Sequence, residues 1–133
     1  MGFIRTLLGD IEPEKLGVTY SHEHIKCEPP YWKEKGEDDL LLDDFKKSLK
    51  EVEDFKKAGG NSIIDATVID YGRDSNSVAK ISQETGVHIV GTTGFNKSFL
   101  WGAKIPNKNI TFAQWIEDSS VNELSEYLSL IHI

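Results

Sequence analysis

The chain has 133 residues, 38% of them hydrophobic and 28% charged, which is enough for one domain with a modest core. Its formal net charge of −7 argues against nucleic-acid binding, which usually needs a basic face, and no apolar run approaches the ~20 residues of a membrane-spanning helix. The N-terminal residues lack the apolar stretch of a signal peptide, so we expect a cytoplasmic protein with neither a nucleic-acid nor a membrane partner.

The first part of the chain predicts two strands. Residues 3–8 read as a short strand that is followed by a turn at positions 9–10. Residues 18–25 are rich in β-branched and aromatic side chains, which favour a second strand. A Pro-Pro pair at positions 29–30 ends this regular structure.

From residue 39 onward the hydrophobic period changes to that of a helix. Apolar residues recur at steps of three and four, with charged residues between them, at Leu42, Phe45, Leu49 and Val52. The glycine pair at positions 59–60 is a typical end for this amphipathic helix. Residues 62–67 then predict a short, mostly buried strand.

The rest of the chain repeats this alternation. Asp74 or Ser75 can cap a second helix, and Gly86 is expected to end it. Residues 87–92 predict a third buried strand. After a long loop, Thr111 is expected to cap a third helix, whose apolar pattern continues beyond an acidic and serine-rich interruption.

The order of these elements predicts an α/β fold with a parallel sheet. Near-continuous apolar strands that alternate with amphipathic helices are typical of such sheets, and each crossover should be right-handed. We therefore expect strands 18–25, 62–67 and 87–92 to be adjacent, parallel and in sequential order. The pattern does not separate an open doubly wound sheet from part of a closed barrel. No glycine-rich nucleotide loop follows a strand, which argues against nucleotide binding.

The sharpest motif is the His22-Glu23-His24 sequence at the end of the first core strand. Side chains two apart in a strand share a face, so His22 and His24 should point together and Glu23 away. Their Cβ atoms would lie ~6.5–7 Å apart, a spacing at which two imidazoles can converge on one metal ion. In parallel α/β folds, sites gather at the carboxyl ends of strands. Spacing alone leaves a chance pair of histidines as the alternative.

Two polar residues on the second strand and the single cysteine are further candidates. Asp65 and Thr67 share a face, and Thr67 lies nearer the strand end, where a site would form. Asp65 can accept a hydrogen bond from a ligand histidine, or it can be a buried carboxylate satisfied by the backbone or Arg73. Cys27 stands alone, which excludes an internal disulfide and a Cys-x-x-Cys site, and we expect a buried, inert thiol.

Taken together, these residues resemble the phosphotriesterase-like family of the amidohydrolase superfamily. Residues 7–25, which include GVTYSHEHI, are similar to that family's opening hairpin and first barrel strand. Residues 60–67 (GNSIIDAT) resemble its second strand, and residues 86–95 (GVHIVGTTGF) its third. The Gly-Arg-Asp sequence at positions 72–74 matches a turn typical of the family. The likeness runs in register over about residues 3–96 and is weaker beyond them.

The resemblance implies the N-terminal part of a (β/α)8 TIM barrel, with about three βα units plus an N-terminal hairpin. Since a barrel needs ~250 residues, we expect residues 1–127 to form an incomplete barrel. Family members carry two divalent metal ions, usually zinc, bridged by a carboxylated lysine and a hydroxide. The resemblance implies that His22 and His24 bind the more buried of the two metal ions and that the remaining ligands lie on later strands. It assigns no catalytic residue in this chain.

The resemblance also implies a metal-dependent hydrolase of ester, lactone or phosphotriester bonds, with a small-molecule substrate. This chain alone is expected to be inactive, and the full-length protein is expected to be a homodimer. Asn96 stands where many relatives carry an aromatic residue that lines the leaving-group pocket, so the substrate class stays open.

Two alternative functions remain at this point. A metal-dependent deoxyribonuclease of related barrel fold also opens with His-x-His, although in that group the motif lies almost at the N-terminus. The other alternative is a non-catalytic fragment or binding module. Residues 128–133 match the translation of a transposon-end adaptor used in sequencing libraries, which predicts a non-native tail; a natural apolar helix end is the alternative.

Overall fold

The computed structural model describes residues 2–36, 38–105 and 109–128. The tail predicted to be non-native therefore lies outside the described residues, except for Leu128. The strands are β1 (Ile4–Thr6), β2 (Gly9–Ile11), β3 (Thr19–Glu23), β4 (Ser62–Asp65) and β5 (His88–Gly91). The α-helices are α1 (Trp32–Lys35), α2 (Phe45–Lys57), α3 (Ser75–Thr85), α4 (Phe112–Asp118) and α5 (Val121–Leu128). Single 3-10 turns cover Pro13–Lys15, Ile69–Tyr71 and Ser98–Leu100.

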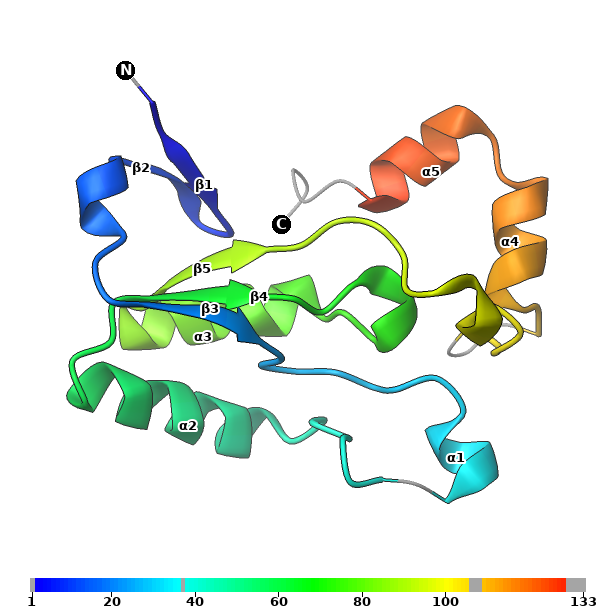
Figure 1. Cartoon of the computed structure of the whole chain (residues 1–133), viewed down its shortest axis with the longest axis horizontal. Coiled ribbons are helices and arrows are strands. Elements are labelled where there is room, and N and C mark those ends of the chain that lie inside the picture. The colour runs from blue at the N-terminus through cyan, green and yellow to red at the C-terminus, as the bar shows by residue number, and fades with distance from the viewer. Residues whose placement is uncertain (1, 37, 106–108, 129–133) are drawn as a thin grey trace.

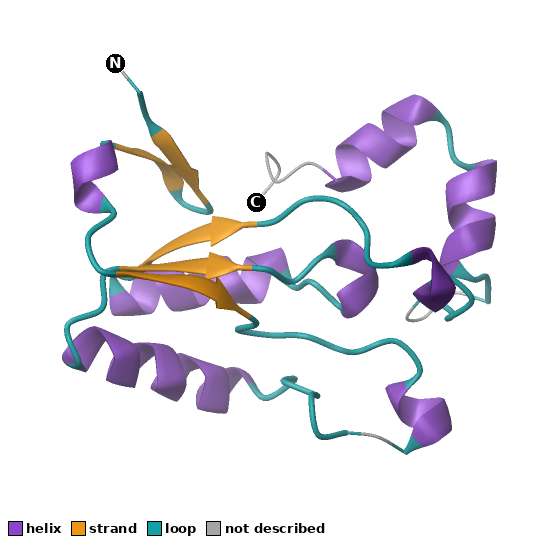
Figure 2. Cartoon of the chain, in the orientation of Figure 1, coloured by secondary structure: helices purple, strands orange, loops and turns teal. Residues whose placement is uncertain are grey.

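The core of the fold is a parallel sheet in the order β3-β4-β5, which confirms the predicted topology. The crossover helices α2 and α3 lie side by side and cover one face of this sheet (Figures 1 and 2). All three strands point the same way, so the loops that follow them gather beyond one end of the sheet (Figure 1). Any site built from several of these loops must therefore lie at this end.

The N-terminal hairpin corrects the prediction of a single strand over residues 3–8. The structure has antiparallel strands β1 and β2 instead, with the turn at Leu7 and Leu8 rather than at positions 9–10. Leu7 is apolar, which favoured a strand in the prediction. It is a turn residue instead, and its side chain is buried in the hydrophobic core. Its N–H donates to the Ile89 carbonyl at 2.8 Å, which ties the hairpin turn to β5.

Polar caps set the start of the two crossover helices. The Asp44 side chain accepts from two backbone N–H groups of α2 and so caps this helix. The helix therefore begins at Phe45, whereas the helical spacing of apolar residues was predicted from residue 39 onward. Leu42 lies before the helix, where it pairs with Cys27 in an isolated β-bridge. Asp74 caps α3 and Gly86 ends it in the left-handed conformation, as predicted.

The main hydrophobic core fills the space between the sheet, the hairpin turn and the two crossover helices. Its buried members are Leu7, Ile25, Val52, Ile63, Val78, Ala79, Ile81, Val87 and Ile89. Ile81, Val87 and Ile89 are fully buried. Burial of such side chains contributes roughly 1.5–3 kcal/mol each, so this cluster supplies most of the driving force for folding.

A second, smaller cluster lies around α4. Ala103, Ile105 and Phe112 are buried there, with Tyr31, Trp101, Ile110 and Trp115 packed against them. Thr111 begins α4 with a capping box to Gln114, which confirms the predicted cap. The helix ends at Asp118, and α5 begins at Val121, as the interrupted apolar pattern predicted.

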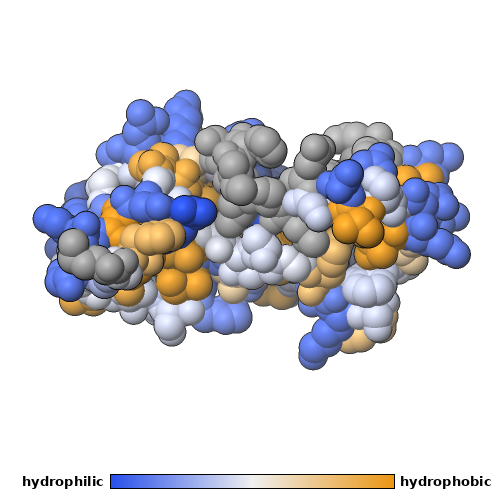
Figure 3. Space-filling model, turned by 90° about the horizontal axis from the view of Figure 1, so that it is seen from above, coloured by the Kyte–Doolittle hydropathy of each residue, from blue (hydrophilic) through white to orange (hydrophobic). Residues whose placement is uncertain are grey.

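Exposed hydrophobic residues lie near both ends of the upper face of the molecule, toward the hairpin and toward α4 and α5 (Figure 3). Phe3 and Leu8 of the hairpin region and Val121 of α5 are among the exposed large hydrophobic residues of the chain. Within the described ranges, no helix has the length and apolar character needed to cross a membrane.

Two glycines in left-handed conformations allow a matched stability test. Gly72 has φ 76°, and a Cβ there would lie 2.5 Å from the Glu28 backbone nitrogen. Gly86 has φ 71°, and a Cβ there would meet no atom within 4 Å. We expect Gly86→Ala to cost about 1 kcal/mol, and Gly72→Ala to cost a further ~1–3 kcal/mol because backbone must move. Urea denaturation followed by circular dichroism measures both, and equal losses would contradict the close packing at Gly72.

Candidate functional site

The register between β3 and β4 is irregular just where the histidines lie. Tyr20 pairs with Ile63 and Glu23 with Asp65, so three steps along β3 match two along β4. Tyr20 packs edge-on against Phe55 of α2, with ring centroids 5.7 Å apart. His22 is two residues further on and would share this face in a regular strand, but it lines a cavity with His24 away from α2. The irregular step therefore turns His22 away from the helix layer.

His22 and His24 face the same cavity, as their spacing predicted. His22 lies within β3, and His24 follows the last residue of that strand. Their ring centroids are 5.5 Å apart, with an angle of 78° between the planes. Glu23 lines another cavity, against α2, which His22 does not line but which His24 also borders.

The cavity at the histidines has a volume of about 450 Å³, and its lining residues lie at or beyond the carboxyl ends of the three parallel strands. The loops after β4 and β5 supply its other walls, with Ala66, Val68, Tyr71, Phe95, Asn96, Lys97, Phe99 and Leu100. None of the ten lining residues is acidic, although the chain as a whole has 22 acidic residues. Lys97 is the one lysine or arginine among these ten residues.

A hydrogen-bonded chain connects His24 to β4. The Nδ1 atom of His24 lies 3.0 Å from the Thr67 hydroxyl oxygen. This hydroxyl lies 2.7 Å from Asp65 Oδ1, which also accepts from the Thr67 backbone N–H at 3.2 Å. Burial raises the pKa of Asp65, although the hydrogen bonds from Thr67 act in the opposite sense. Of the two alternatives for Asp65, the structure favours the buried carboxylate that backbone N–H groups satisfy, and Thr67 lies between Asp65 and His24.

The two histidines are only part of a metal site. Neutral imidazole nitrogens are suitable ligands for zinc and other divalent metals of the first transition row. Within residues 2–36, 38–105 and 109–128, however, no three His, Cys, Asp or Glu side chains are grouped so that they could hold a metal ion. A catalytic zinc site normally has three protein ligands, so the donor set fits a metal in kind but not in number.

Asp70 is a site residue that the sequence reasoning missed. Its buried carboxylate accepts from the Asn96 backbone N–H, at 2.8 Å for Oδ1 and 3.0 Å for Oδ2. The indole N–H of Trp101 donates to the Asn96 carbonyl at 3.1 Å. Both backbone groups of Asn96 are thus held, which fixes the loop after β5 against the loop after β4. These residues are 26 positions apart, so local sequence patterns could not pair them.

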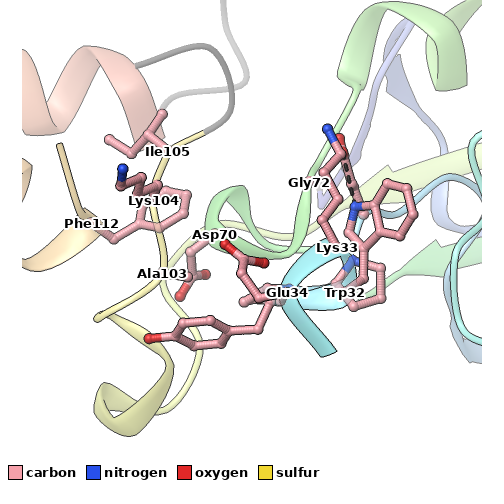
Figure 4. A pocket seen from close by; sticks show the side chains of 13 residues that line it. Trp32, Lys33, Glu34, Asp70, Gly72, Ala103, Lys104, Ile105 and Phe112 are labelled. Atoms are coloured by element: carbon pink, nitrogen blue, oxygen red, sulfur yellow. Dashed lines mark hydrogen bonds between the residues drawn. The ribbon is translucent and has the colours of Figure 1, made fainter. Parts of the chain in front are cut away.

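Asp70 is one of the residues that line another cavity, of about 420 Å³ (Figure 4). Residues 28–34, which include the first three residues of α1, line one side, and residues 103–105 with Phe112 line the other. The indole N–H of Trp32 donates to Glu28 Oε1 at 3.1 Å in this wall. No histidine lines this cavity, so it is separate from the predicted metal ligands.

Cys27 and Arg73 have structural partners. Cys27 is buried and its thiol donates to the Leu40 carbonyl at 3.2 Å. Burial raises the pKa of Cys27 to about 11, so the group is a neutral thiol at pH 7, in agreement with the inert thiol that we expected. Arg73 Nη1 donates to the Thr92 carbonyl at 2.8 Å, while Lys26 forms an ion pair with Asp74 at 3.1 Å.

Comparison with known proteins gives a consistent result. The sequence matches the model of the Phosphotriesterase family over residues 2–128. The crystal structure of a lactonase from Listeria monocytogenes is 54% identical, covers 96% of this chain and 41% of that chain, and superposes with a TM-score of 0.83. The sheet and hairpin thus match the N-terminal part of a TIM barrel of this family.

Two curated relatives are hydrolases whose names state their substrates. The human N-acetyltaurine hydrolase is 31% identical over 71% of this chain. The phospho-furanose lactonase of Mycoplasmopsis synoviae is 34% identical over 81% of this chain. The chain spans 35% of the length of the first relative and 33% of the second.

The buried Asp70 carboxylate predicts a specific dependence of stability on pH. Burial raises the pKa of Asp70, despite the hydrogen bond from Asn96. Its contribution to stability is therefore fully present below the unfolded-state pKa of ~3.9 and is lost as pH rises through the folded-state pKa. We expect Asp70→Asn to remove this decline while keeping an acceptor for Asn96. Asp70→Ala should cost ~1–3 kcal/mol at all pH values, because the Asn96 N–H loses its partner.

Urea unfolding of the three proteins between pH 4 and pH 8 measures this difference. A wild-type decline that persists unchanged in Asp70→Asn would assign the pH dependence to another group.

Proposed function

Because the chain belongs to the phosphotriesterase family, we propose that it is the N-terminal part of a metal-dependent hydrolase, with His22 and His24 as ligands of one of two divalent metal ions. The observation that carries this proposal is the convergence of the two imidazoles on one cavity at the carboxyl end of the sheet. In barrels, this end is where active sites form. Residues 1–127 would then be the incomplete barrel, and the homodimer of the full-length protein remains a prediction.

Zinc is the metal that we propose first. Imidazole nitrogens suit zinc, and the two histidines supply them in a cavity that has no carboxylate among its lining residues. When bound, such ions polarise a carbonyl or phosphoryl oxygen and lower the pKa of an attacking water. The chain's own residues bind and orient: the histidines hold the ion, and the aromatic walls exclude solvent around the substrate.

We infer that the substrate is a lactone or another small ester. The Listeria lactonase shares 54% of its residues with this chain, against 31% for the human N-acetyltaurine hydrolase, an amide hydrolase by name. Phe95, Phe99 and Leu100 offer an apolar wall on which the carbon ring of a lactone can pack. Asn96 keeps its place on this wall through Asp70, where its small polar side chain leaves more room than an aromatic ring would.

The cavity gives little support to the deoxyribonuclease alternative. Nucleic-acid sites need several cations for the phosphate backbone, and Lys97 is the one lysine or arginine among the ten lining residues. The alternative of an inactive fragment concerns this chain by itself, and it is compatible with a hydrolase for the full-length protein.

The 133-residue chain alone should show no metal-dependent turnover. Two histidine ligands are one short of the usual minimum for a catalytic zinc, and a second ion would have no protein bridge among the described residues. The test is to purify the chain, add Zn²⁺ or Mn²⁺, and assay a γ-lactone, an aryl ester and a phosphotriester. Turnover at an enzymatic rate that is lost in His22→Ala would show that the described ligand set is sufficient.

A gene product that extends to the length of these relatives should be active. We expect lactone hydrolysis to exceed aryl ester and phosphotriester hydrolysis. We also expect His22→Ala or His24→Ala to lower kcat/KM by at least ~100-fold, because loss of a ligand weakens binding of the metal ion and, with it, electrostatic stabilisation of the transition state. The exposed and distant Lys80→Ala is the matched control and should leave kcat/KM unchanged. Full activity in both histidine variants would exclude them as ligands.

A further inference from the structure

The hydrogen-bonded chain from Asp65 to His24 has a defined direction. Asp65 Oδ1 accepts from the Thr67 backbone N–H, so this oxygen acts as an acceptor. The Thr67 hydroxyl lies 2.7 Å from the same oxygen, and its single proton is therefore directed at Asp65. The hydroxyl oxygen then has lone pairs, but no proton, for its contact with His24 Nδ1 at 3.0 Å.

This direction determines where the neutral imidazole carries its proton. A hydrogen bond between Nδ1 and an oxygen that can only accept requires an N–H at Nδ1. Nε2 is then the unprotonated nitrogen, whose lone pair is free for a metal ion. We propose that Thr67, backed by Asp65, is a positioning residue that holds His24 as the Nδ1–H tautomer and makes Nε2 its metal-binding atom. The metal part of this proposal rests on the proposed function, and the tautomer does not.

The surroundings of these residues favour a fixed arrangement. Thr67 is fully buried and Asp65 is 3% exposed, so water does not compete for their hydrogen bonds. The His24 ring packs between the Tyr71 ring and the His22 ring, each with a centroid distance of 5.5 Å. The ring plane and the proton position are thus set by different neighbours.

A simpler role for Thr67 is to satisfy the buried Asp65 carboxylate alone. In that case the contact with His24 would be incidental, and loss of the hydroxyl would affect stability but not the histidine tautomer. The tautomer is therefore the quantity that separates a positioning role from a structural one.

The first test is nuclear magnetic resonance of the metal-free, ¹⁵N-labelled chain at a pH where its imidazoles are neutral. Long-range ¹H–¹⁵N correlations distinguish the two tautomers, and the spectrum of His24→Gln identifies the His24 signals. We expect Nδ1–H at His24 in the wild type and in Thr67→Ser, which keeps the hydroxyl. Thr67→Val has nearly the same shape without the hydroxyl, and it should shift His24 toward Nε2–H. A wild-type chain with Nε2–H at His24 would overturn the proposal without any variant.

The second test is Zn²⁺ affinity, measured by isothermal titration calorimetry on the same proteins. Loss of a hydrogen-bond partner of a ligand histidine typically costs 10–100-fold in affinity, so we expect about that loss in Thr67→Val and recovery in Thr67→Ser. His22→Ala should weaken zinc binding but leave the His24 tautomer unchanged. Thermal unfolding of each variant confirms that the measured protein is folded.

The outcomes separate the two proposals. Wild-type zinc binding with an unchanged tautomer and affinity in Thr67→Val would overturn the positioning role and leave the metal ligands in place. An Nδ1–H tautomer that depends on Thr67, in a chain whose zinc binding does not respond to His22→Ala, would support the positioning of His24 and contradict the proposed ligand pair.

Discussion

The irregular step in the β3–β4 register is the constraint on which the candidate site depends. A regular strand that placed the Tyr20 ring beside Phe55 of α2 would turn His22 toward the same helix. The extra residue between Tyr20 and Glu23 allows one short strand to pack an aromatic ring on one side and present an imidazole on the other. Irregularities of this kind occur often beside active sites, where they redirect a side chain. The fold of this region thus combines packing and site geometry within five residues.

The elements that the sequence predicted well are those with local signals. Asp74 caps α3 and Gly86 ends it because both act on backbone groups within one turn. The parallel order of the strands follows from their apolar composition and the helices between them. The hairpin was placed wrongly because Leu7, an apolar residue, serves as a turn residue whose partner, Ile89, is far away in sequence. Hydrophobicity identifies a buried residue, but it does not say whether the backbone there is a strand or a turn.

The candidate site was predictable to a similar extent. Strand periodicity paired His22 with His24, and both line one cavity. The separation from Glu23 holds for His22, whereas His24, beyond the end of β3, also borders the cavity that Glu23 lines. Periodicity also placed Asp65 and Thr67 on one face, but the order of their contacts with His24 depends on side-chain positions in three dimensions. Asp70 carried no pattern at all, because its role is to hold a backbone N–H from the next loop. Contacts between loops require the folded arrangement of the sheet.

The position of His24 relative to the sheet explains why its ring needs the hydrogen-bonded chain from Thr67 and Asp65. Among the described strands, β3 is an edge strand that pairs only with β4, and His24 lies beyond the last ladder pair, Glu23 with Asp65. Ladder hydrogen bonds therefore cannot fix the His24 ring. The support comes through Thr67 from Asp65, the last residue of the central strand β4, which pairs with Glu23 on one side and Gly91 on the other. A candidate ligand beyond the end of its own strand is thus held by a hydrogen-bonded chain that leads to a buried carboxylate on the central strand.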